Sequence, residues 1–257
     1  YIEEESLVPQ QSNQTIEQEP SQAITPPTSS AIDNTNKLFN DTSIISTDGN
    51  EITVHNINEL LYHLSPDKHF KLMPGGDYDL FNADSSIKSE YFSYGTLLNL
   101  SNVTIEGLGD KQVDIITHSS GNVLDFAGCS GITLINLNIG HDSTNKECLG
   151  DVLVLGSNCS NITIHDCTLF GCGRIGINAD SVSDIKCENS VIRDCTYQLI
   201  HLSNVNDVVF ENCLFHTRFD QDIIIDSSKN VRISSSELSG DYCNYPKILA
   251  NDLNIIE

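Results

Sequence analysis

A pattern that returns every 23 residues limits what this chain can fold into. Four successive units begin at Ser160, Ser183, Asn206 and Lys229. An earlier unit begins at Ser130 and differs by an insertion of seven residues. A fixed period of roughly 20–50 residues is typical of stacked repeats, in which no unit can bury its own apolar face. The chain is therefore expected to form a stack of similar rungs.

Within each unit, apolar and polar residues alternate. The third and fifth residues are apolar and the fourth is usually polar, as in Ile162, Thr163 and Ile164. Further apolar residues recur at positions ten, eighteen and twenty. Alternation of this kind predicts about three short strands per unit, each with one buried face. Position seven is expected to line a bend and to form a hydrogen-bonded column; it is occupied by Asn136, Asp166, Asn189, Asn212 and Ser235.

Two other repeat architectures have periods or strands of this kind. A leucine-rich repeat would need a helical return segment. Here the return segments alternate like strands, as in Ile175–Ile177 and Ile223–Ile225. A coil of hexapeptide repeats would place an apolar residue every six positions, which the sequence does not do. The pattern favours a coil made of strands alone.

A short helix is expected before the repeats. Asn56 and Glu59 have the spacing of a capping box, which opens a helix. Pro66 ends the segment. The apolar residues between them have helical spacing: Ile57, Leu60, Leu61 and Leu64. A helix over 57–64 is suited to cover the open end of a stacked core.

The order of these segments resembles a known superfamily. The helix is followed by the Leu-x-Pro-Gly-x-x-Tyr-x-Leu pattern of residues 72–80 and then by the repeats. This order resembles the pectin-lyase-like right-handed parallel β-helix superfamily over roughly residues 50–257, and most of all bacterial β-helix repeat proteins without assigned activity. The resemblance implies an all-β, single-stranded right-handed parallel β-helix with rungs of about 23 residues.

The resemblance does not extend to known catalytic motifs. The Asn-Thr-Asp, Asp-Asp, Gly-His-Gly and Arg-Ile-Lys motifs of polygalacturonases are missing, and Gly140-His141-Asp142 is a partial echo. The Trp-x-Asp-His element of pectate lyases cannot occur in a chain without Trp. One fold hosts many chemistries, so the resemblance predicts the fold and leaves the activity open.

Composition divides the chain into two parts. Residues 1–45 are rich in Ser, Thr, Gln, Pro and Glu and have too few apolar side chains to form a core. We expect a disordered tether there and a β-helix domain over residues 46–257. Such a tether, together with the missing initiator Met, predicts a processed protein that is secreted or held at a cell surface, in the manner of a lipoprotein.

The formal net charge of −23 restricts the partners. An acidic surface disfavours nucleic acid and anionic membranes. It also repels polyanionic polysaccharides unless calcium bridges the two, so calcium is the one metal cofactor we consider. Neutral glycans meet no such barrier, and eight Tyr residues are available for stacking. No apolar run is long enough to span a membrane.

The nine cysteines recur at regular positions. Cys129 and Cys159 precede successive units, and Cys172 and Cys195 both occupy position thirteen. Periodic inward cysteines are more typical of core packing than of a disulfide framework. We therefore expect most of them to be reduced.

Charged residues converge on one corner of neighbouring units, beside the insertion at 141–148. A cation, a titratable base and a carboxylate within reach of one sugar are what proton abstraction or glycosidic cleavage needs. The predicted catalytic residues are Arg193, His216, Arg218, Asp220 and Asp222. The predicted substrate-binding residues are His141, Asp142, Arg174 and Asp194.

Two alternatives remain open for the outward face. The corner can also be a solvated surface on which Arg and Asp pair with one another. A column formed by His165, Glu188 and Glu211 could bind a cation, because carboxylates one rung apart repel each other.

Two functional classes follow from the sequence. The first is a polysaccharide lyase or glycoside hydrolase, and the second is a non-catalytic binding, adhesion or surface-structural protein. The favoured interpretation is a protein that binds polysaccharide at an outward face, with its cleavage left open. The C-terminal segment 253–257 has the pattern of a strand and no evident cap, so end-on self-association is also expected.

Overall fold

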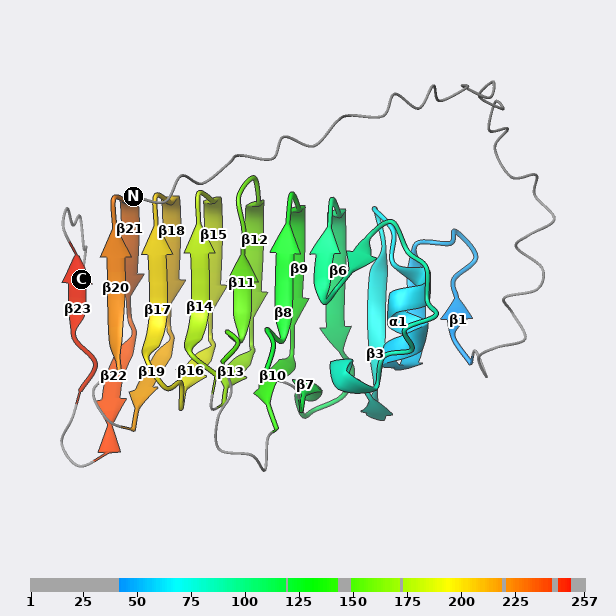
Figure 1. Cartoon of the computed structure of the whole chain (residues 1–257), viewed down its shortest axis with the longest axis horizontal. Coiled ribbons are helices and arrows are strands. Elements are labelled where there is room, and N and C mark those ends of the chain that lie inside the picture. The colour runs from blue at the N-terminus through cyan, green and yellow to red at the C-terminus, as the bar shows by residue number, and fades with distance from the viewer. Residues whose placement is uncertain are drawn as a thin grey trace, which may run out of the picture. The chain divides into compact units, whose positions relative to one another are not determined.

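The computed structural model describes residues 42–118, 120–142, 149–171, 173–218, 221–241 and 245–250. Most of the predicted tether at 1–45 lies outside these residues, as does the C-terminal segment on which end-on association depends. Within the described part, strands follow one another as a coil and stack along its long axis (Figure 1).

Three sheets form the sides of the coil. Among the described residues, the first sheet has nine strands: β1 (Ile44–Ile45), β2 (Glu51–Asn56), β3 (His69–Asp77), β6 (Ser101–Gly107), β9 (Ser130–Ile135), β12 (Ser160–His165), β15 (Ser183–Glu188), β18 (Asn206–Glu211) and β21 (Lys229–Ser234). The second described sheet has six: β7 (Val113–Thr117), β10 (Leu137–His141), β13 (Thr168–Phe170), β16 (Val191–Arg193), β19 (Leu214–Thr217) and β22 (Glu237–Gly240).

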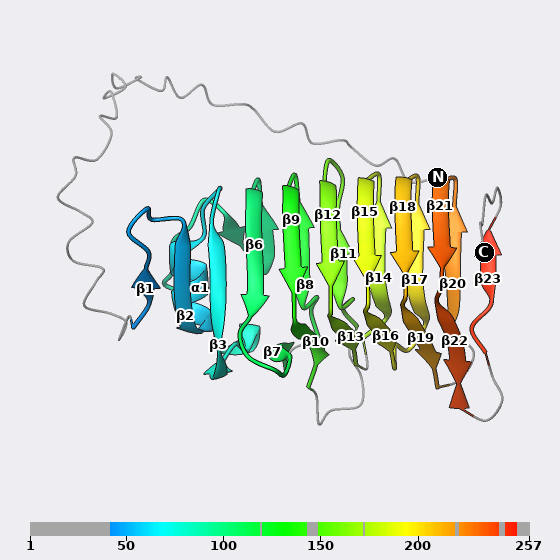
Figure 2. The ribbon, with the colours of Figure 1, turned by 180° about the vertical axis from the view of Figure 1, so that it is seen from behind.

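The third sheet of the described residues has eight strands: β4 (Phe92–Ser93), β5 (Thr96–Leu98), β8 (Leu124–Ala127), β11 (Leu153–Leu155), β14 (Ile175–Asp180), β17 (Gln198–Ser203), β20 (Asp222–Asp226) and β23 (Ile248–Ala250). Figure 1 shows this sheet in front, and Figure 2 shows the first sheet from the opposite side. Each repeat thus gives one strand to each sheet.

The pairing of the strands reproduces the sequence period. Ile162 lies opposite Ile185, and Ile185 lies opposite Val208, in parallel pairs 23 residues apart. The return segments that distinguish this coil from a leucine-rich repeat are the strands β14 and β20. The predicted all-β stack of parallel rungs is therefore confirmed.

The inward positions of the strands form a continuous apolar core. Ile162, Ile164, Leu169 and Ile177 of one rung are at most 1% exposed, and the equivalent residues of the other central rungs are similarly buried. Each fully buried side chain of this kind contributes about 1.5–3 kcal/mol relative to an exposed one. Because every rung shares its core with its neighbours, the outward positions and corners are free to vary.

Asn-like side chains occupy the corners because the backbone turns there with positive φ. The five residues at position seven have φ between 50° and 54°, a left-handed conformation that Asn, Asp and Gly adopt most readily. Their side chains also link rungs: Asn212 Nδ2 donates to Asn189 Oδ1 at 2.7 Å. The predicted column of bend residues is confirmed.

The helix α1 (Ile57–His63) lies at the start of the coil, one residue shorter than predicted. The backbone N–H of Glu59 donates to Asn56 Oδ1 at 2.9 Å, which confirms the cap. The buried Glu59 carboxylate accepts hydrogen bonds from the backbone N–H groups of Thr42 and His55. Although burial alone would raise the pKa of Glu59, these hydrogen bonds lower it.

The contacts of Thr42, and the antiparallel pairing of β1 with β2, place residues 42–45 in the folded body. The predicted boundary between residues 45 and 46 is therefore a few residues too late.

Cysteine and serine are interchangeable at one inward column of the coil. The Ser190 hydroxyl accepts from the backbone N–H of Cys167 at 3.1 Å, and the Ser236 hydroxyl accepts from that of Cys213 at 3.0 Å. The six cysteines that the structure describes are all free and buried: Cys129, Cys159, Cys167, Cys187, Cys195 and Cys213. For these six, the predicted packing in the core is confirmed; Cys172 lies outside the described residues.

Candidate functional site

The predicted site lies where the second sheet turns into the third. We call it the charged corner and define it by Arg174, Arg193, Asp194, His216 and Arg218. Asp194 lies between two arginines: Arg193 Nη1 donates to its Oδ2, and Arg218 Nε lies 3.5 Å from its Oδ1. The Arg193 guanidinium also lies 5.0 Å from the centroid of the Phe170 ring. Both arginines therefore have partners within the protein.

His216 is the in-register neighbour of Arg193 on the next rung, as the period predicts. Its Nδ1 is 2.9 Å from Ser239 Oγ, and its Nε2 is 3.6 Å from Asp241 Oδ1. Asp222, at the start of β20, accepts a hydrogen bond from the backbone N–H of Lys247 at 3.0 Å. The structure thus brings Arg193 and His216 together, and it engages Asp222 with the adjacent segment. Asp220 lies outside the described residues.

His141 is not part of the outer surface. It ends β10 with 4% of its surface exposed, and its imidazole packs against Gly173. Since the Gly121 carbonyl can only accept, His141 Nε2 donates to it, at 2.8 Å. Burial lowers the pKa of His141 and favours the neutral ring. The predicted substrate-binding role of His141 at the outward face does not fit this burial, because the strand turns its side chain toward the corner glycine Gly173 before the insertion begins.

The other predicted substrate-binding residues also have protein partners. Arg174 Nε lies 3.6 Å from Asp151 Oδ1, and the Asp151 carboxylate is 6% exposed. Asp142 is exposed, and its Oδ2 is 3.8 Å from His118 Nε2. With these contacts, the charges of the corner are largely neutralised by one another. The geometry matches the alternative of a solvated corner with Arg–Asp pairs.

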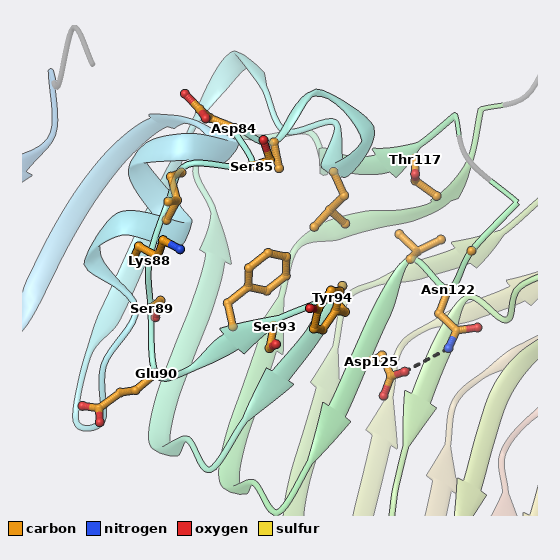
Figure 3. A pocket seen from close by; sticks show the side chains of 17 residues that line it. Asp84, Ser85, Lys88, Ser89, Glu90, Ser93, Tyr94, Thr117, Asn122 and Asp125 are labelled. Carbon is orange, nitrogen blue, oxygen red and sulfur yellow. Dashed lines mark hydrogen bonds between the residues drawn. The ribbon is translucent and has the colours of Figure 1, made fainter. Parts of the chain in front are cut away.

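A cavity of about 790 Å³ lies elsewhere, between the segment that follows β3 and the turn that precedes β8. We call it the loop cavity (Figure 3). Apolar side chains and polar side chains both face it. Its lining includes Leu80, Asp84, Lys88, Glu90, Phe92, Tyr94, Thr117, Asn122, Val123 and Asp125.

A tight hairpin forms one wall of the loop cavity. β4 and β5 pair antiparallel, and Tyr94 and Gly95 connect them with φ of 49° and 88°. Two successive residues with positive φ are typical of the type I′ turn that joins such strands. Because the turn projects away from the sheet, the Tyr94 side chain is fully exposed. Its ring is available to a ligand.

Long-range contacts hold the loop in place. Asp79 caps η2 (Leu80–Asn82) by accepting from the Phe81 backbone N–H at 2.9 Å, and its other oxygen is 2.6 Å from His118 Nδ1. Further along, the backbone N–H of Asp84 donates to Asn58 Oδ1 at 2.8 Å. These contacts fasten the loop both to the residue that follows β7 and to α1. The loop cavity is therefore preformed.

The charges of the loop cavity differ from those of the corner. Within the described residues, Asp84, Lys88, Glu90 and Asp125 form no ion pair. Asp125 Oδ2 accepts from Asn122 Nδ2 at 3.0 Å, which holds both groups at the cavity wall (Figure 3). Hydrogen bonds from Ser86, chiefly from its backbone N–H, lower the pKa of Asp84 and favour the ionised carboxylate. The cavity thus combines charged groups that form no ion pair among the described residues with an exposed aromatic ring at its edge.

The repeat pattern gave no signal for this cavity. Its wall comes from residues 80–95, which lie before the regular units and have no counterpart in them. Gly95 was the available clue, since Gly is one of the strongest local signals of a turn. Among the described residues, no group of three or more His, Cys, Asp or Glu side chains is placed to hold a metal ion.

The sequence model of the right-handed β-helix region family matches residues 84–238. This chain belongs to that family. The right-handed β-helix fold that the resemblance implies is thereby confirmed. No protein with a curated sequence matches the chain.

One solved structure with a similar fold is the pectin methylesterase from Aspergillus niger in deglycosylated form. It is 14% identical, with a TM-score of 0.44, and the alignment covers 75% of this chain and 66% of that one. The chain therefore spans about two thirds of that enzyme's length. In the described part of the chain, no helix is both long and apolar enough to cross a membrane.

Proposed function

We propose that this protein is a glycan-binding β-helix protein and that its loop cavity holds a neutral oligosaccharide segment. The observation that carries the proposal is the fully exposed Tyr94 ring beside a preformed cavity whose charged side chains form no ion pair in the described part of the chain. The right-handed β-helix supplies a rigid support for such a cavity.

The size and chemistry of the cavity suit a short stretch of sugar. Ligand cavities usually enclose about 300–1,000 Å³, and the loop cavity falls in that range at about 790 Å³. Sugars present apolar faces that stack on aromatic rings and hydroxyls that hydrogen-bond to carboxylates and amides. Tyr94 and Phe92 offer the first kind of contact, and Asn122 and Asp125 offer the second.

Charge favours neutral glycans over anionic ones. Three acidic residues, Asp84, Glu90 and Asp125, line the cavity, against the single basic residue Lys88. The chain as a whole carries a formal charge of −23. A polyuronate would meet repulsion both at a distance and on contact, unless a cation such as calcium bridged it.

Cleavage of the glycan by a lyase or glycoside hydrolase activity is a separate prediction. It would require catalytic residues at the charged corner. Its arginines and histidine already have protein partners, which favours a binding protein over an enzyme. A secreted or surface-tethered location would give such a protein access to polysaccharide, and it stays a prediction.

The test is calorimetric titration of the full chain with neutral oligosaccharides from β-glucan, xylan and galactomannan, and with oligogalacturonate, each with and without calcium. Tyr94→Asn is the informative variant, because Asn-Gly preserves the type I′ turn and removes the ring. Phe81→Ala is the matched control, since Phe81 is an exposed aromatic of the same loop that does not line the cavity.

We expect at least one neutral oligosaccharide to bind and Tyr94→Asn to weaken that binding roughly tenfold, as the loss of a stacked ring predicts. Phe81→Ala should bind like the unmodified protein. Binding of none of the neutral glycans, or equal binding by Tyr94→Asn, would overturn the proposal. Products with reducing ends or ultraviolet absorbance would add catalysis to it.

A further inference from the structure

Two thiols meet in the core of the C-terminal half of the coil. The Sγ atoms of Cys187 and Cys213 lie 3.9 Å apart, and both residues are at most 2% exposed. Cys187 belongs to β15, and Cys213 follows β18 on the next rung. The pair therefore spans two successive rungs.

The contact is diagonal between the rungs. Cys187 is opposite Phe210 in the strand register, and Cys213 lies three residues further along, past the turn at Asn212. The turn brings the Cys213 side chain back toward the inner face of β15, where its thiol also lies 3.4 Å from the Cys187 carbonyl oxygen. Cys187 thus reaches the contact from a strand, and Cys213 reaches it from the turn after the next strand of the sheet.

Cys129 and Cys159 meet in another way. Each lies one residue before an in-register pair, Ser130 and Ser160, so their side chains point in the same direction from successive rungs. Parallel side chains of this kind do not readily reach a Cβ–S–S–Cβ dihedral near 90°. The diagonal pair has no such restriction.

We propose that Cys187 and Cys213 form a redox-dependent disulfide that staples two rungs of the coil. With oxidised glutathione as the oxidant, one thiolate attacks a glutathione sulfur, forms a mixed disulfide and releases one reduced glutathione. The second thiolate then displaces the other glutathione and closes the protein disulfide. Two protein thiols lose two protons and two electrons, and one oxidised glutathione becomes two reduced molecules.

Hydrogen bonding with Cys187 lowers the pKa of Cys213, while burial acts in the opposite direction. The same contact and burial raise the pKa of Cys187. Because both thiols are buried, the reaction proceeds through local opening of the C-terminal rungs.

The serines at the same inward column provide a variant that preserves the packing. Ser190 and Ser236 occupy the position of Cys213 on the neighbouring rungs, and the backbone tolerates them there. Cys213→Ser should therefore fold and lack the second sulfur. Cys167→Ser is the matched control, because Cys167 occupies the same column and its thiol donates to the carbonyl oxygens of Leu134 and His165.

The experiment treats the full chain with oxidised glutathione, in buffer and again in mild urea to permit opening. Free thiols are then alkylated, and cross-linked peptides are identified by mass spectrometry. We expect a Cys187–Cys213 peptide, and a melting temperature raised by ~5–10 °C by a cross-link that closes a loop of ~26 residues. The reductant dithiothreitol should reverse both. Cys213→Ser should abolish the peptide and the shift, and Cys167→Ser should retain them.

Two results would overturn the proposal. The first is the absence of the Cys187–Cys213 peptide in both conditions. The second is a cross-linked peptide with no reversible rise in melting temperature, which would mean that the bond strains the coil and does not staple it. A Cys129–Cys159 peptide in place of the expected one counts with the first result.

Discussion

The charged corner and the loop cavity carry similar residue types in opposite states. At the corner, Asp194 is shared by Arg193 and Arg218, and Arg174 faces the nearly buried Asp151. In the cavity, Lys88 and three carboxylates have no ion-pair partner among the described residues, and the Tyr94 ring is fully exposed. The charges of the corner are paired within the protein, whereas those of the cavity form no ion pair among the described residues.

The difference follows from the way each region is built. At the corner, side chains one rung apart are separated by about 4.8 Å, the spacing of paired strands, so opposite charges on successive rungs meet and neutralise each other. The cavity wall is a loop without repeats, so no stacked neighbour places an opposite charge beside each of its charged groups. Charge convergence in a repeat is therefore weaker support for a site than unpaired charge beside a cavity.

The two regions should differ most in how much stability the protein loses when a glycine in each is replaced by alanine. A Cβ added to Gly173, at the corner, would lie 2.6 Å from both the Gly150 carbonyl oxygen and His141 Cε1. We expect Gly173→Ala to lower the free energy of unfolding by ~2–4 kcal/mol. Gly95→Ala, in the hairpin of the cavity, would meet no atom within 4 Å, and the positive φ alone should cost ~1 kcal/mol. Urea unfolding of both variants measures the contrast; equal losses would show that the cavity hairpin is packed as tightly as the corner.

Glycan affinity should depend on side chains of the loop cavity and not on those of the charged corner. With any oligosaccharide that the protein binds, Tyr94→Asn is expected to weaken binding roughly tenfold. Arg193→Ala and His216→Ala should leave the dissociation constant within about twofold, because those side chains contact Asp194, Phe170, Ser239 and Asp241. Calorimetry on the three variants is the measurement. A large loss in the corner variants with an unchanged Tyr94→Asn would return the site to the charged corner.

Lowering the pH should reduce the stability of the protein through His141, which packs against Gly173 beside the corner. Its pKa is lowered in the folded state from 6.5 by burial, so the unfolded chain binds the proton more readily. The stability that this residue contributes is present above the unfolded pKa and is lost as pH falls below about 6.5. We expect the melting temperature to drop between about pH 7.5 and about pH 5. His141→Gln can still donate to Gly121 and cannot be protonated, so its drop should be smaller; an identical drop in both proteins would contradict this account.

The coil was predictable because its information is local and repeated. The 23-residue period set the strands, the buried faces and the register that makes Arg193 and His216 neighbours. The bend residues were predictable for the same reason, since a backbone with positive φ selects Asn and Asp at every rung.

The candidate site depends on contacts that no period encodes. Asp79 meets His118, and Asp84 meets Asn58, across long stretches of sequence, and these contacts create the cavity. The sequence correctly predicted that the charges of the corner lie on adjacent rungs, but it did not predict how they pair. The pairing depends on the turn at Asp194, whose φ of 59° directs its carboxylate between the two arginines.

The smallest expected effect concerns that carboxylate. Asp194→Asn keeps a residue that tolerates positive φ and removes the charge shared by Arg193 and Arg218. The side chains of the two arginines are 38% and 63% exposed, so solvent screens the interaction and the loss of stability should be about 0.5 kcal/mol or less. Salt should shrink the difference further. Chemical unfolding at low and high ionic strength checks both points, and glycan titration should find no change. A loss of ~2 kcal/mol or more that persists in high salt would mean that the corner is a buried, organised network, and the case for a functional role there would have to be reopened.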